Sequence, residues 1–232
     1  MERYETVKSK NGKYLLDIRY DYDAETPREW DNLGTIHGYW RDTRGIIDEA
    51  ASGEYNSFEE EFENEVGKFE DYIYLDVYGY EHGGRAVSTG SFGCPWDSGQ
   101  VGYIYVSKKD VLAEFGGKRV SKKLREKVER ILESEIEVLD RWLQGEVYSY
   151  RLYEINEKEL KNQITDELYD FDEGFETLSE EEQNKIVEEV YLERLQELDD
   201  EEFIEMSEEI DSCWGFYGEE HIYNSLPDDF EV

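Results

Sequence analysis

Apolar residues alternate with polar ones in some stretches of this chain and recur at helical intervals in others. The alternation over 13–23 and over 72–78 is typical of strands with one buried face. Ser57 and Ser121 each precede a helical pattern, and Gly145 is a suitable end for the second helix. Strands and helices mixed in this way predict an α+β fold in which helices pack against an antiparallel sheet.

A second helical pattern lies in a strongly acidic background over 157–206, with a capping box beginning at Ser179. The alternating stretch 210–217 then predicts a return to a strand. We therefore expect an α+β core formed by 1–156 with 207–232, and an acidic helical insertion formed by 157–206.

Charge is the feature of the composition that changes this picture most. The 232 residues include 60 acidic and 25 basic side chains, for a net charge of −35, and the stretch 154–232 alone holds 29 acidic and four basic ones. Aromatic residues make up 15% of the chain, which argues against disorder. Such a charge excludes direct binding to nucleic acid or to an anionic membrane. It equals the charge of roughly 17 or 18 base pairs of duplex DNA, so the natural partners are basic surfaces.

The sequence contains no sign of a membrane or of an oxidising compartment. No apolar run approaches the roughly 20 residues that span a bilayer, and the first residues lack the apolar core of a signal peptide. Two cysteines do not form a disulfide framework. We expect a cytoplasmic protein.

Few residues suggest catalysis or metal binding. Cys94 with His82 as its base, and Asp97 nearby, is a conceivable nucleophile pair, although a cysteine is more often a small buried residue. Together with Cys213 and His221, the same cysteine and histidine would form a Cys₂His₂ zinc set, but the spacings match no familiar zinc pattern. Nucleotide-binding motifs are absent from the sequence. We expect no catalytic residue, no metal and no cofactor, and a small Cys/His-dependent enzyme remains the alternative.

Binding to a basic partner is the function that the charge pattern favours. The candidate residues belong to acidic runs on predicted helices. They are Glu180, Glu181, Glu182, Glu188, Glu189, Asp199, Asp200, Glu201 and Glu202, followed by Glu59, Glu60 and Glu61. The stretch 108–130 is the exception, with nine basic and four acidic residues. We expect it to pair with the acidic helices or to offset their repulsion.

Three stretches together resemble an uncharacterised family of acidic proteins from bacteriophages and plasmids. They are 29–35 (EWDNLGT), 94–102 (CPWDSGQVG) and 211–218 (DSCWGFYG). The resemblance covers about 14–153 and 207–218, and the chain departs from it by inserting the acidic helical stretch where a tight connection is expected. The resemblance implies a mobile genetic element, which benefits from blocking restriction and CRISPR systems of its host.

Charge and resemblance together predict an anti-defence inhibitor encoded by a phage or plasmid. It would act as an acidic nucleic-acid mimic in the bacterial cytoplasm and occupy the basic nucleic-acid-binding cleft of a host restriction or CRISPR protein. A regulatory interaction module for another basic partner is the second alternative.

Overall fold

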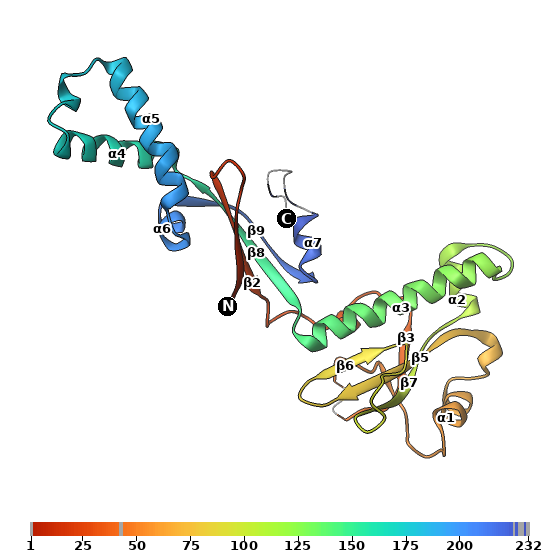
Figure 1. Ribbon diagram of the computed structural model, residues 1–232. Coiled ribbons are helices and arrows are strands. Elements are labelled where there is room, and N and C mark those ends of the chain that lie inside the picture. Colours follow the sequence, from red (N-terminus) through yellow and green to blue (C-terminus); the bar gives the residue numbers. More distant parts are fainter. Residues whose placement is uncertain (1, 42–43, 225, 227–229, 231–232) are drawn as a thin grey trace. The chain divides into compact units, whose positions relative to one another are not determined.

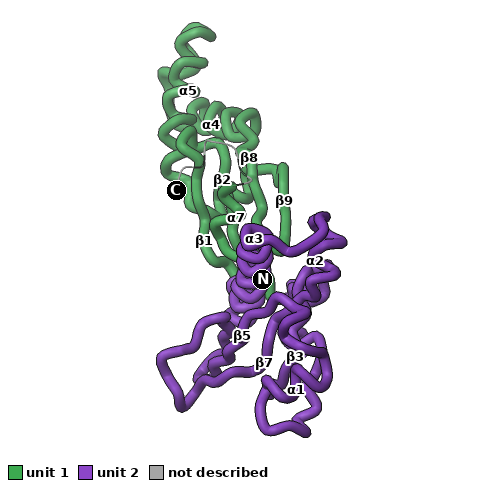
Figure 2. The backbone as a smooth tube through the Cα atoms, turned by 90° about the vertical axis from the view of Figure 1, so that its right-hand side faces the viewer, with its two compact units in different colours: residues 1–22, 147–232 green, residues 23–146 purple. Residues whose placement is uncertain are grey.

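The computed structural model describes residues 2–41, 44–224, 226 and 230. The chain forms two compact units, one from 1–22 with 147–232 and the other from 23–146 (Figures 1 and 2). Antiparallel sheets packed against helices confirm the predicted α+β fold. The sequence predicted a single sheet, whereas each unit has a sheet of its own.

The first unit contains a four-stranded antiparallel sheet in the order β1-β2-β8-β9. Its strands are β1 (Arg3–Lys8), β2 (Tyr14–Tyr20), β8 (Val147–Ile155) and β9 (Ser207–Tyr217). Three helices and a 3₁₀ turn are inserted between β8 and β9, and a short helix follows β9 (Figure 1). They are α4 (Glu157–Phe171), η3 (Phe175–Thr177), α5 (Glu180–Glu197), α6 (Asp200–Glu205) and α7 (Glu220–Tyr223).

The inserted helices are folded onto the first sheet. One hydrophobic core joins Leu15 of β2 and Tyr153 of β8 to Leu160 of α4, Tyr191 of α5 and Phe203 of α6. This packing holds the helices and the sheet in one compact unit. The two units therefore do not coincide with the predicted core and insertion.

Strand β2 buries residues on both of its faces. Leu16 and Ile18 lie in a second core, which also contains Ile222 of α7. Asp17 lies between these two residues and is fully buried, although the alternating pattern predicts an exposed side chain there. Arg3 and Arg19 form ion pairs with its carboxylate at 3.1 and 2.7 Å, which offsets the cost of burying the charge.

The second unit contains a five-stranded sheet in the order β4-β3-β7-β5-β6. Its strands are β3 (Thr35–Gly38), β4 (Glu49–Ala50), β5 (Tyr72–Glu81), β6 (Arg85–Ser88) and β7 (Ser98–Ser107). All pairs are antiparallel except β3 with β4. The other elements are η1 (Pro27–Glu29), α1 (Phe58–Glu65), η2 (Phe69–Asp71), α2 (Lys108–Phe115) and α3 (Lys122–Gln144).

Helices cover both faces of this second sheet (Figure 1). Val128, Leu132 and Ile136 of α3 share a core with aliphatic residues of β5, β7 and neighbouring strands. On the other face, Phe62 of α1 packs among the tyrosines of β5 and β7, with its ring centroid 5.1 Å from that of Tyr105. Helix α1 therefore packs against the tyrosine-bearing face of β5 and β7.

Helix α3 begins and ends where the sequence predicts. The Ser121 hydroxyl accepts a hydrogen bond from the Leu124 amide at 3.2 Å, as an N-cap does. Gly145 has φ of 75°, the left-handed conformation that commonly ends a helix.

Candidate functional site

The acidic surface of the first unit lies on the outer sides of α4, α5 and α6. The stretch 157–206 carries 20 acidic and four basic residues, for a net charge of −16. Its apolar positions face the core, so the acidic positions of the same helices face solvent. A folded support therefore presents these carboxylates.

Basic side chains of this segment mainly join one helix to the next. Lys161 of α4 forms ion pairs with Glu157 of its own helix at 2.7 Å and with Glu188 of α5 at 2.5 Å. Arg194 of α5 pairs with Glu167 of α4 at 2.9 Å. These pairs use two of the four basic residues of the segment, which has 20 acidic residues, so most of its carboxylates cannot have a basic neighbour from within the segment.

Glu157 is the most strongly stabilised carboxylate of the segment. It accepts hydrogen bonds from Lys13 and Lys161, each at 2.7 Å. These two bonds, that from Lys13 first, lower the pKa of Glu157 to about 2. Glu157 therefore links β2 and α4 rather than serving as a free charge.

Several of the predicted acids have structural roles. Glu182 accepts hydrogen bonds from the Ser179 amide and hydroxyl, in the capping box that begins α5. Asp199 and Glu202 form the same arrangement at α6. The Asp200 carboxylate accepts a hydrogen bond from the Thr6 hydroxyl at 2.5 Å. These acids fix helix ends and contacts within the unit.

Glu180, Glu181 and Glu201 are exposed, and their carboxylates form no hydrogen bond or ion pair with any residue that the structure describes. Glu189 is also exposed, and its single ion pair, with Lys185, is long at 4.0 Å. Among the predicted acids of α5 and α6, these four and the exposed part of Glu188 are the least engaged in contacts within the unit.

The acids predicted on α1 belong to the second unit, and one of them is not on the surface. Glu61 is 4% exposed and accepts hydrogen bonds from the Ser52 hydroxyl and the Gly53 amide. Its place on an exposed acidic face is therefore a wrong prediction, because the side chain folds back to hold the preceding loop. Glu59 and Glu60 are exposed, and Glu60 accepts a hydrogen bond from Asn56.

Sequence reasoning missed part of the acidic surface. The segment 157–206 has further exposed acids whose carboxylates form no hydrogen bond or ion pair with a described residue: Glu159, Asp166, Asp170, Glu173, Glu176, Glu193, Glu197 and Glu205. Six of them lie on α4, α5 and α6 at outward positions, where helical periodicity and not the search for acidic runs was the signal; Glu173 and Glu176 lie between α4 and α5. Large apolar side chains lie among them: Phe171 is 87% exposed and Leu192 is 51% exposed.

The structure brings the predicted thiol, histidine and aspartate together, in an unexpected order. The Cys94 thiol donates to Asp97 Oδ2 at 3.2 Å, and His82 Nδ1 lies 3.5 Å from Asp97 Oδ1. The aspartate therefore separates the thiol from the imidazole. The imidazole thus contacts the aspartate and not the thiol, which it would need to reach in order to act as its base.

The four residues considered for zinc are divided between the units, with His82 and Cys94 in one and Cys213 and His221 in the other. Across the described part of the chain, no group of three or more histidine, cysteine, aspartate or glutamate side chains is arranged to hold a metal ion.

His37 of β3 is a buried titratable residue that the sequence analysis did not identify as a candidate. It is 4% exposed, with Nε2 3.3 Å from a carboxylate oxygen of Glu65 and Nδ1 3.9 Å from one of Glu49. Neither ring nitrogen forms a hydrogen bond with a described residue. The Phe62 ring lies edge-on to the imidazole, so this buried group is closed to a substrate.

The basic stretch 108–130 pairs with its own acids. Lys122 and Arg125 of α3 form ion pairs with Glu126 and Glu129, one turn along the helix. The Lys127 ammonium lies 4.2 Å from the centre of the Phe115 ring. The structure thus shows local contacts of these basic residues, whereas the sequence analysis expected them to pair with the acidic helices or to offset the repulsion of those helices.

No family model matches the chain, and no match was found among curated proteins or among solved structures. Within the described residues, no helix combines the length and the apolar character needed to cross a membrane.

Proposed function

We propose that this chain is an inhibitory binding protein of a phage or plasmid, and that its acidic helices occupy the basic nucleic-acid-binding cleft of a host restriction or CRISPR protein. One observation carries the proposal: the outer sides of α4, α5 and α6 present many exposed carboxylates, while the segment has four basic residues, two of which are used in pairs between helices. Inhibition would be competitive and would require no chemistry.

The amount of charge suits a nucleic-acid cleft. A net charge of −16 equals that of about 27 Å of duplex DNA, at one charge per roughly 1.7 Å. The 18-residue helix α5 is about 27 Å long at 1.5 Å per residue. The charge of the whole segment, spread over α4, α5 and α6, therefore equals that of a duplex about as long as its longest helix.

Exposed apolar side chains would add binding energy from contacts that a nucleic acid backbone cannot make. Phe171 is flanked by Asp170 and Asp172, and Leu192 by Glu193. Interfaces obtain much of their binding energy from a few buried apolar or aromatic anchors, whereas complementary charge mainly speeds association. A partner with a basic cleft and an adjacent apolar patch fits both features.

The proposal is tested by competition. The purified protein is mixed with each member of a panel of restriction and Cas nucleases, and DNA binding is measured by fluorescence anisotropy at several salt concentrations. We expect displacement of DNA from at least one nuclease, with an association rate that falls steeply as salt rises.

Matched variants locate the surface. Replacing Glu189, Glu193 and Glu197 by glutamine removes three charges from one stripe of α5. Replacing the exposed acids Glu59, Glu63 and Glu70 removes the same number from the second unit. We expect the first triple variant to weaken inhibition at least about tenfold and the second to change it less than about threefold.

Equal effects of the two triple variants would mean that net charge, and not this surface, is responsible. Indifference of every nuclease in the panel, together with capture of a basic partner unrelated to nucleic acid, would instead support the regulatory module.

A further inference from the structure

A mostly apolar cavity of the second unit lies between helix α3 and the segment formed by η1 and the loop that follows it. Its volume is about 510 Å³, within the range of roughly 300 to 1,000 Å³ typical of small-molecule sites. Pro27 and Trp30 form the loop side, and Ile131 and Val138 form the helix side. The acidic surface of the first unit takes no part in it.

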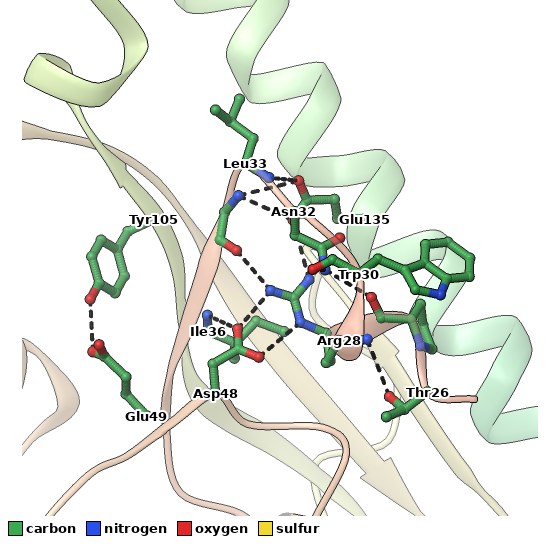
Figure 3. A network of polar contacts seen from close by, with 12 residues as sticks. Thr26, Arg28, Trp30, Asn32, Leu33, Ile36, Asp48, Glu49, Tyr105 and Glu135 are labelled. Carbon is green, nitrogen blue, oxygen red and sulfur yellow. Dashed lines mark hydrogen bonds and ion pairs between the residues drawn. The ribbon is translucent and has the colours of Figure 1, made fainter. Parts of the chain in front are cut away.

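A buried polar network holds the loop wall in place (Figure 3). The Arg28 side chain is 5% exposed and donates to Asp48 at 2.6 Å, to Glu135 at 3.2 Å and to the Gly34 carbonyl at 2.7 Å. Glu135 of α3 in turn accepts hydrogen bonds from the amides of Leu33 and Gly34. These bonds tie the loop to the helix, so the cavity is formed before any ligand arrives.

Packing at Gly34 adds to this rigidity. A Cβ atom on this residue would lie 2.6 Å from Leu132 and 2.8 Å from Ile104, so the loop approaches the core as closely as its backbone allows. The motif 29–35 therefore has a structural reason for its glycine.

The cavity is electropositive in a strongly acidic protein. Lys127 and Arg130 line it, and neither forms an ion pair with a residue that the structure describes. Glu135 is the one acidic residue among those described that line the cavity, and it shares the buried Arg28 with Asp48, so the two basic side chains of the lining outnumber its single carboxylate. The nearby acids Glu133 and Glu137 line a different cavity.

We propose that this cavity binds a small organic anion with a flat apolar body, of the aromatic carboxylate or sulfonate class. The apolar body would lie against Trp30, Ile131 and Val138, and the anionic group would face Lys127 and Arg130. Asn32 and Ser134 supply the remaining polar atoms of the lining. Charge complementarity selects an anion, and the size of the cavity selects a small molecule.

The probe is 2-naphthoate, measured by isothermal titration calorimetry with the full chain, and 2-naphthylmethanol is its uncharged analogue. We expect saturable binding of one naphthoate per chain in the range up to about 1 mM, and binding of the alcohol at least about fivefold weaker.

Variants on one helix separate the cavity from the rest of the surface. Ser134→Phe fills the cavity from an exposed helical position and is expected to abolish binding. The double variant Lys127→Gln with Arg130→Gln should weaken binding about fivefold or more. Its control, Lys122→Gln with Arg125→Gln, removes the same charge outside the cavity and should leave binding unchanged.

Absence of naphthoate binding to the unaltered chain, equal binding of the alcohol, or full binding to the correctly folded Ser134→Phe variant would each overturn the proposal. A second copy of the chain is the other occupant to test, by sedimentation. If the chain self-associates, and if Ser134→Phe abolishes this self-association while naphthoate does not affect it, then this face binds the chain itself. That result would also overturn the proposed anion site.

Discussion

Helices α3 and α5 are built in the same way but differ in surface charge, which is balanced on α3 and strongly negative on α5. Each begins at a serine N-cap and buries one apolar side in the core of its own unit. Helix α3 carries six basic and six acidic residues, and several form pairs one turn apart. Helix α5 carries seven acidic and two basic residues.

This difference shows that the acidity of α5 is not a requirement for a stable amphipathic helix. Glu189, Glu193 and Glu197 follow one another at intervals of four residues, where like charges destabilise a helix. Balanced charge would stabilise the helix better, as it does in α3. A surface that reduces stability in this way is more readily explained by binding than by folding.

The largest expected effect is the difference in stability loss between replacing a buried leucine of α3 and replacing a half-exposed leucine of α5. Leu132 of α3 is fully buried, so Leu132→Ala should lower the free energy of unfolding of the second unit by about 2 to 5 kcal/mol. Leu192→Ala on α5, where the side chain is half exposed, should change stability by at most about 0.5 kcal/mol. Urea denaturation combined with amide hydrogen exchange measures each unit. Similar losses for both variants would mean that Leu192 is buried in solution.

Removal of the N-caps should affect the two helices about equally. Ser121→Ala and Ser179→Ala each delete a hydroxyl that accepts a backbone hydrogen bond, at an expected cost of about 1 kcal/mol. Hydrogen exchange of the first-turn amides is the measurement. A loss several times larger at Ser179 would show that the whole capping box, and not the hydroxyl alone, holds α5.

Neutralising outward charges should have opposite effects on α5 and α3. The triple glutamine variant of Glu189, Glu193 and Glu197 should raise stability by about 0.4 to 1 kcal/mol, because two repulsive pairs are removed. Glu126→Gln with Glu129→Gln on α3 should lower it by about as much, because two attractive pairs are removed. Thermal unfolding in low salt measures both, and both differences should shrink as salt rises. A less stable α5 variant would contradict the inferred repulsion.

The smallest expected effect is the response to acid of the link between β2 and α4. The pKa of Glu157 is lowered to about 2, so the carboxylate form stabilises the folded state. This contribution is fully present above the ordinary value of 4.5 and is lost as pH falls through that value toward 2. Thermal unfolding between pH 6 and pH 2 should show the loss in the unaltered chain, and Glu157→Gln should remove that part of the pH dependence. An unchanged pH profile in the variant would rule out this role.

Much of the fold was predictable because it depends on local patterns. The N-cap at Ser121, the end at Gly145 and the capping box at Ser179 are all found where the sequence places them. Elements such as β1 and β4, with six and two residues, were not predicted, because they contain too few residues to show a period.

The candidate surface was predicted only in part. Runs of acids identified Glu180 and Glu181, but the same runs included Glu61, which is buried, and Glu182, which caps a helix. An acid near a helix start can either face solvent or fold back onto backbone amides, and the sequence does not distinguish these outcomes.

The sequence by itself determined the α+β class, the main helices and the concentration of negative charge between β8 and β9, because all three depend on composition and on local periodicity. Only the tertiary structure decided that the acidic helices pack onto the first sheet, that Arg28 and Glu135 bind one loop to α3, and that Asp97 separates Cys94 from His82. Those contacts join residues whose distances in space are set by the packing of whole elements, which no local pattern encodes.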